Sequence, residues 1–125
     1  MIHYIGANVL HPEPVVDDEE HYGPATSKYA SAFTSSDQAV VVGVWEFEGE
    51  QFTRPGLGQE EGYEEILVLT HGTLKVECDG GMYDLEAGDV IVYDCPVGAK
   101  HLSSPNGFKG IFVVRYREPR VPAPS

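Results

Sequence analysis

From Gln38 onward, apolar and polar positions alternate in short runs that are separated by turn-forming residues. Runs with a period of two predict β-strands, and no segment keeps the 3.6-residue period of an amphipathic helix for long. The pattern therefore predicts an all-β domain, either a sandwich or a barrel. The predicted strands cover 39–47, 51–54, 64–70, 73–78, 82–85, 90–93 and 108–117.

Turn signals stand between these runs. The sharpest is Asp79-Gly80, which predicts a hairpin with a type I′ turn because both central residues of that turn need positive φ. Glycine, proline and asparagine mark the remaining turns, at 48–49, 71–72, 87–89, 96–98 and 104–107.

The run Ile66-Leu67-Val68-Leu69 is apolar at every position, whereas a strand with one wet face should alternate. Both faces of this strand are therefore expected to be covered. In a small barrel one side fills the interior, and the other needs a second sheet or a partner subunit. A homodimer is the simplest arrangement that meets this need.

The 125 residues suffice for one domain with a core of its own. Residues 1–37 predict an N-terminal strand followed by an acidic connector, in which Asp17-Asp18-Glu19-Glu20 is a solvated charge run. Residues 38–118 hold the strand pattern and form the predicted barrel. Residues 119–125 contain three prolines and no apolar period, which predicts a flexible tail.

The net charge of the chain narrows the classes of partner that we expect. Twenty Asp and Glu against eight Lys and Arg give a formal charge of −12, which repels nucleic acid and anionic membranes. No apolar run approaches the roughly 20 residues of a membrane span, and the first ten residues do not resemble a signal peptide. We therefore expect a cytoplasmic protein in which Cys78 and Cys95 are reduced thiols, with a disulfide as the alternative.

Two ordered motifs carry a family resemblance. Glu65 is followed by an apolar strand and then Gly72, and Gly88 is followed by Pro96, Gly98 and His101. From about 42 to 118 the chain resembles the cupin superfamily, although seven residues rather than five separate Gly88 from Pro96. Within it, the segments 43–46 and 49–52 look like the branch that includes ureidoglycine aminohydrolase and the ethanolamine-utilisation cupins. The resemblance implies a double-stranded β-helix, a jelly-roll barrel with a polar pocket inside.

The chain departs from the cupin pattern at the metal histidines. Counting back from Glu65, the first two fall on Gln59 and Glu61, or on 58 and 60 with a longer gap, so that His101 alone remains. The resemblance then implies a ligand pocket of Gln59, Glu61, Glu65 and His101, in which Glu61, Glu65 and His101 are the candidate metal ligands. Such an oxygen-rich set suits Mn²⁺, Fe²⁺ or Mg²⁺ better than a structural Zn²⁺.

Adjacent strand residues point to opposite faces, so only one of Glu64 and Glu65 can face the barrel interior. The motif spacing favours Glu65. Two carboxylates within about 4 Å repel by about 4 kcal/mol at an effective dielectric near 20, so a pocket shared by several of these acids needs a cation, a proton or a basic partner. Arg54 and Lys100 are the candidate basic partners.

Two functions remain open. The loss of two histidines favours a metal-free cupin that binds a small polar metabolite. The alternative is an enzyme dependent on Mn, Fe or Mg, of the amidohydrolase or isomerase kind, in which the ion polarises a carbonyl or activates water. Both use the same pocket, so the sequence names its residues without choosing between binding and catalysis.

Overall fold

The computed structural model describes residues 2, 4–6, 10–14, 21–56 and 62–117, and every regular element among them is a β-strand. The strands are β1 (Glu13–Pro14), β2 (His21–Tyr22), β3 (Thr26–Thr34), β4 (Val40–Thr53), β5 (Tyr63–Cys78), β6 (Gly81–Glu86), β7 (Val90–Cys95) and β8 (Lys100–Tyr116). All the strand pairs are antiparallel. The all-β prediction is confirmed. None of the described residues belongs to a helix long and apolar enough to cross a membrane.

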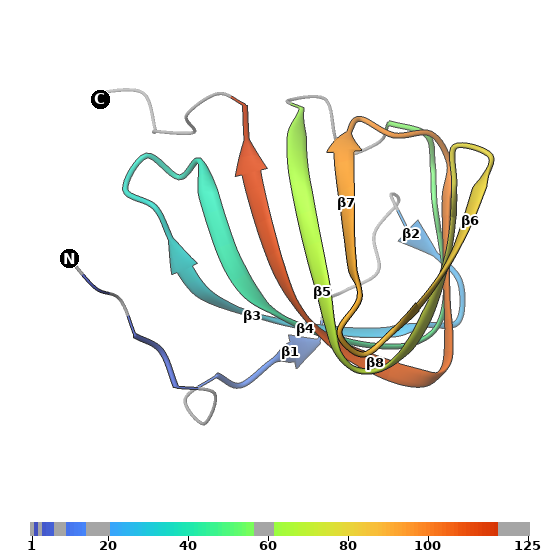
Figure 1. Ribbon diagram of the computed structural model, residues 1–125, viewed down its shortest axis with the longest axis horizontal. Helices are drawn as coiled ribbons and strands as arrows, with labels where there is room; N and C mark the ends of the chain where they lie inside the picture. The colour runs from blue at the N-terminus through green and yellow to red at the C-terminus, as the bar shows by residue number, and fades with distance from the viewer. Residues whose placement is uncertain (1, 3, 7–9, 15–20, 57–61, 118–125) are drawn as a thin grey trace.

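Three long strands, β4, β5 and β8, each take part in two sheets. The first half of β5 pairs with β7 and its second half with β6. Strand β4 pairs with β3 along most of its length and with β2 at its end, and β8 lies between β4 and β5. One sheet therefore contains β3, β4, β8, β5 and β7, and the other contains β2, β4, β8, β5 and β6. Figure 1 shows the long strands curving from one sheet into the other, the arrangement of a jelly roll.

The long strands bend where the sequence predicts turns at 48–49, 71–72 and 104–107. The register shifts between Phe47 and Gly49 on β4, and between Leu69 and Lys75 on β5, while pairing with β8 resumes beyond each shift. These sites are bends inside continuous strands rather than hairpin turns. At Gly72 φ is +83°, and a Cβ would collide with the carbonyl oxygen of Gly107, so the bend requires glycine there.

The hairpin at Asp79-Gly80 is confirmed. Both residues have positive φ, 51° and 76°, and Cys78 pairs with Gly81 across the turn. These are the backbone angles that a type I′ turn requires.

Strand β3 lies in a region that the sequence suggests is part of a connector. Its residues are mainly Ser, Thr, Ala and Lys, which carry no strong apolar alternation. Contacts with β4 hold it in the sheet: the Trp45 indole donates a hydrogen bond to Ser27 Oγ at 2.6 Å, and Tyr29 stacks on Trp45 with ring centroids 5.3 Å apart. The acidic run 17–20 and the tail 119–125 lie outside the described residues.

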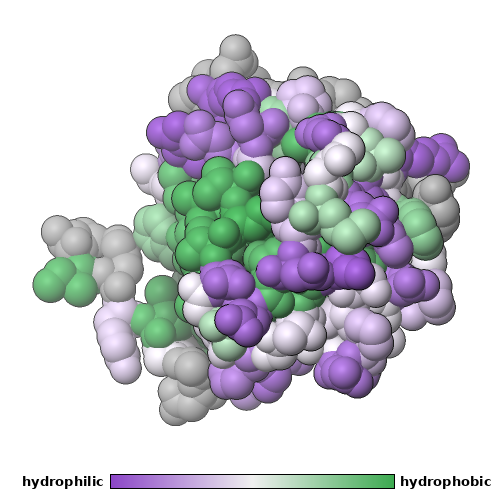
Figure 2. All heavy atoms as spheres, turned by 45° about the vertical axis from the view of Figure 1, so that its right-hand side comes forward, coloured by the Kyte–Doolittle hydropathy of each residue, from purple (hydrophilic) through white to green (hydrophobic). Residues whose placement is uncertain are grey.

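The core fills the space between the two sheets. Its most deeply buried side chains are Leu67, Leu69, Leu74, Val76 and Leu102, joined by an aromatic group of Trp45, Phe47 and Phe108. Full burial of one such aliphatic side chain stabilises the fold by about 1.5–3 kcal/mol. Ile66 and Val68 point to the other side of the sheet, and Figure 2 shows apolar side chains gathered in one area of the molecular surface.

Candidate functional site

Polar side chains gather at one end of the barrel interior, where several strands begin or end. Strand alternation places these residues on inward faces, in line with the buried residues of the same strands. We call them the mouth cluster: Thr53 at the end of β4, Tyr63 and Glu65 at the start of β5, Tyr93 and Cys95 at the end of β7, and Lys100 at the start of β8.

Glu65 faces inward. It shares its side of β5 with buried Leu67 and lies opposite Tyr93 on β7. Glu64 points outward and receives a hydrogen bond from Arg115 at 3.0 Å. This is the orientation that the motif spacing predicts for the two acids.

Lys100 brings a positive charge into the same region. Its Nζ lies 4.6 Å from the centroid of the Tyr93 ring, a cation–π contact. Burial of Tyr93, and next the charge of Glu65, raises the pKa of the Tyr93 hydroxyl far above its usual range. The hydroxyl therefore stays protonated and can donate a hydrogen bond. The cluster thus combines an anion, a cation and a neutral donor.

The two cysteines are free thiols, and both are buried. Burial raises the pKa of each thiol, and Asp79 raises that of Cys78 further. The Tyr63 hydroxyl hydrogen-bonds to the Cys95 thiol, which opposes the effect of burial without reversing it. Because the thiolate is the reactive form, neither cysteine is set up as a nucleophile.

Thr53 carries an unsatisfied polar atom. Its side chain is 5% exposed, and among the described residues its Oγ1 has no hydrogen-bond partner. Strand pairing sets Thr53 directly beside Lys100. An unsatisfied buried hydroxyl costs about 1–3 kcal/mol, which a ligand polar group can recover by hydrogen bonding to it.

His101 lies on the opposite face of β8 from Lys100. Its ring stacks on Phe52 with centroids 4.2 Å apart and planes 1° from parallel, and its Nε2 is 3.6 Å from Glu50 Oε1. Phe52, Glu50 and His101 all alternate with inward residues such as Leu102, so they lie on the outward face of the sheet. There His101 Nε2 is buried, and among the described residues it has no hydrogen-bond partner. The structure does not bring His101 together with Glu65.

The inward position at the start of β8 is taken by Lys100, the residue before His101. The cupin motif does not mark this residue. The signal for it was present in the strand itself, because Lys100, Leu102 and Ser104 stand two apart, and Leu102 and Ser104 are both 1% exposed. Predicted pocket residues Gln59 and Glu61 lie outside the described part of the chain.

The described residues do not supply a metal site. None of them form a group of three or more His, Cys, Asp or Glu side chains placed to hold an ion. Of the predicted ligands, Glu65 faces inward and His101 faces away.

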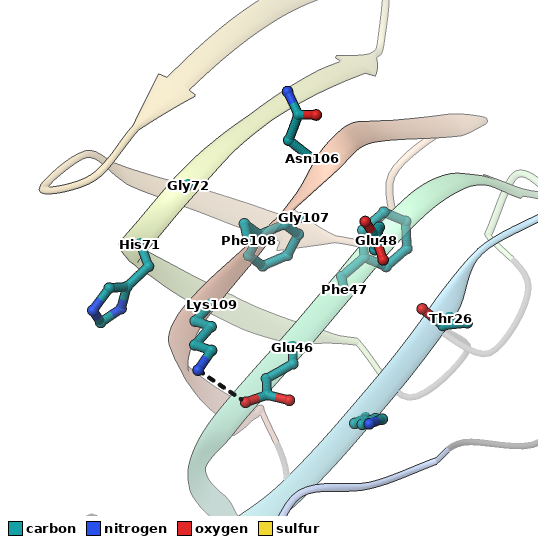
Figure 3. A pocket seen from close by; sticks show the side chains of 11 residues that line it. Thr26, Glu46, Phe47, Glu48, His71, Gly72, Asn106, Gly107, Phe108 and Lys109 are labelled. Atoms are coloured by element: carbon teal, nitrogen blue, oxygen red, sulfur yellow. Dashed lines mark ion pairs between the residues drawn. The ribbon is translucent and has the colours of Figure 1, made fainter.

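A separate pocket of about 390 Å³ lies on the outer surface, where β3, β4, β5 and β8 pass one another (Figure 3). Across it, Lys109 Nζ and Glu46 Oε1 form an ion pair at 3.5 Å, so these charges already satisfy each other. His71 stands at its edge and contacts its own neighbour Thr70 at 3.1 Å. No member of the mouth cluster lines this pocket.

Comparison with known proteins identifies the fold of this chain. No protein-family model matches the sequence, and no curated protein matches it. Among solved structures, a predicted oxalate decarboxylase from Thermotoga maritima is 15% identical with a TM-score of 0.70, over 90% of this chain and 98% of that one. The Clostridium difficile EutQ protein is 18% identical with a TM-score of 0.59, over 74% of this chain and 64% of that one.

The cupin domain of Cnp3 from Schizosaccharomyces pombe is 12% identical to this chain, also with a TM-score of 0.59, over 72% of this chain and 61% of that one. This chain therefore spans less than two thirds of the EutQ and Cnp3 structures. At these identities the likeness concerns the fold, and it agrees with the strand topology described above. The chain has the cupin fold, a small double-stranded β-helix.

Proposed function

We propose that this protein binds a small polar metabolite inside the barrel, at the mouth cluster, without a resident metal. The observation that carries the proposal is that two side chains of opposite charge, Glu65 on β5 and Lys100 on β8, both lie on inward faces at the same end of the barrel. Tyr93 lies next to each of them. Burying a charged group costs free energy unless a partner compensates its charge. Charged side chains beside the core, such as Glu65 and Lys100, therefore lower the stability of the fold, and a binding role is a reason for their presence there.

The cluster suits a ligand that has a carboxylate and a hydrogen-bond donor. Lys100 and Thr53 are cross-strand partners, and the ammonium of one and the hydroxyl of the other can both bind a carboxylate. Glu65 accepts hydrogen bonds from a hydroxyl or amino group of the ligand, and the Tyr93 hydroxyl donates. Small hydroxy acids, amino acids and ureido acids present this combination.

Binding can be detected as a shift in melting temperature. A ligand at a hundredfold excess over its Kd stabilises the folded state by about 2.7 kcal/mol. The screen contains small carboxylates, ureides, sugars and divalent ions. We expect stabilisation by members of the carboxylate group and no response to the ions.

The matched variants are Glu65→Gln and Glu64→Gln, adjacent residues on opposite faces of β5. Glu65→Gln should remove most of the ligand-induced shift, and Glu64→Gln should preserve it. A panel in which no small molecule stabilises the wild type, or in which a ligand stabilises both variants equally, contradicts the proposal.

A further inference from the structure

One outer face of the barrel is apolar across four neighbouring strands. Two cross-strand rows make it up, one passing through Ile66 and the other through Val68, and both continue onto β7. We call this the outer apolar face: Val42, Val44, Ile66, Val68, Val90, Val92, Ile111 and Val113.

Several of these side chains are exposed to a degree unusual for aliphatic residues. Val90 is 56% exposed, Val92 is 60% exposed and Ile111 is 41% exposed. They are contiguous in the sheet rather than scattered, and contiguous apolar surface of this kind marks an interaction site. The same strand that fills the core with Leu67 thus presents Ile66 and Val68 to this face.

The borders of the face are nearly neutral in a strongly acidic chain. At one end, Arg115 pairs with Glu64 at 3.0 Å, and Arg117 pairs with Asp94. At the other end, Lys109 pairs with Glu46 at 3.5 Å, and the strand register places Lys28 beside Glu46.

Four of the eight Lys and Arg residues of the chain therefore border this face. Two copies that each carry a net charge of −12 repel each other over most orientations. Around the outer apolar face, each acidic border residue already has a basic neighbour. This is the part of the surface where electrostatic repulsion between two copies is weak and apolar burial is available.

We infer that a second copy of this chain docks here, sheet against sheet, in a two-fold symmetric dimer. An isologous interface brings the same patch from both copies together, and alternating charges along the borders let each basic residue meet an acidic residue of the other copy. Packed sheets lie about 10 Å apart, a spacing that aliphatic side chains from the two faces fill by interdigitation.

Sedimentation equilibrium tests this inference directly, with wild type and Val92→Asp compared at up to about 100 µM, a range that detects micromolar affinity. The wild type should sediment at twice the mass of the chain. Because two-fold symmetry places the new carboxylate in the interface twice, Val92→Asp should weaken association by roughly 100-fold or more. Val90→Asp serves as a second variant if the melting temperature of Val92→Asp shows that it does not fold.

Met82→Asp is the matched control, since Met82 is 59% exposed but lies on β6 in the other sheet. It should leave the dimer intact. A monomeric wild type, a Val92→Asp variant that dimerises as the wild type does, or a Met82→Asp variant that dissociates equally would each overturn the inference. The ligand-induced melting shifts are measured separately, so loss of the dimer and loss of binding are distinguishable.

Discussion

Lys100 Nζ lies 4.6 Å from the centre of the Tyr93 ring, and this contact joins the start of β8 to the end of β7 inside the barrel. Tyr93 is also the cross-strand neighbour of Glu65. One aromatic ring thus separates the positive and negative groups of the mouth cluster. The polar metabolite that we propose carries groups of both signs and would bridge them.

Stability should fall at alkaline pH. Burial raises the pKa of Tyr63, Tyr93 and both thiols above the values of about 10.0 and 9.0 that these groups have when unfolded. The folded state therefore retains protons that the unfolded state releases. Their contribution is fully present below pH 9 and is lost as the pH rises further.

The measurement is the melting temperature between pH 7 and pH 10.5. Tyr93→Phe should flatten the alkaline decline, and Tyr83→Phe, at a side chain that is 50% exposed, serves as the control. An alkaline decline that Tyr93→Phe leaves unchanged would show that the phenol is not its source.

Alanine substitutions at two glycines with similar backbone angles distinguish the cost of backbone strain from the cost of steric crowding. Gly80 has φ +76° and nothing within 4 Å of an added Cβ, so Gly80→Ala should cost about 1–2 kcal/mol from backbone conformation alone. Gly72 has φ +83°, and its Cβ would collide with the Gly107 backbone, so Gly72→Ala should cost about 2–5 kcal/mol. Urea unfolding of both variants measures the difference. Equal costs would mean that β5 and β8 are not in close contact at the bend.

Metal content should be far below one ion per chain. The described residues form no group of three or more metal-ligating side chains, and His101 stacks on Phe52 outside the barrel. Elemental analysis of protein purified without chelator or nickel column checks this, with melting temperature before and after chelator as a second readout. One tightly held ion per chain, with a loss of stability on its removal, would favour the enzyme reading of the site.

Much of the fold could be predicted from the sequence. Local signals sufficed for the Asp79-Gly80 hairpin and for most of the strands, because period-two alternation and turn chemistry act over a few residues. Strand β3 was missed since pairing with β4, rather than its own composition, holds it in the sheet. The bend at Gly72 was read as a turn because a local signal does not reveal that two strands stay paired beyond it.

One feature of the mouth cluster, the inward side of Glu65, could be predicted. The side of β5 on which Glu65 lies follows from the adjacent apolar strand, and the structure places it inward. The motif pointed to His101, but motif spacing alone does not set the alternation of side chains along β8. Buried Leu102 does fix it, and the inward residue is Lys100.

If the proposed ligand binds inside the barrel, the adjacent residues Lys100 and His101 should affect binding differently, because their side chains point to opposite faces of β8. The measurement is the melting shift that the best ligand of the screen produces in Lys100→Gln and in His101→Gln, followed by calorimetric titration of each. Loss of the Lys100 charge should weaken binding by at least about tenfold, the lower range for a charge-assisted hydrogen bond, and His101→Gln should bind as the wild type does. Binding that survives in Lys100→Gln and disappears in His101→Gln would mean that the ligand binds outside the barrel interior, on the outward face of the sheet beside Phe52.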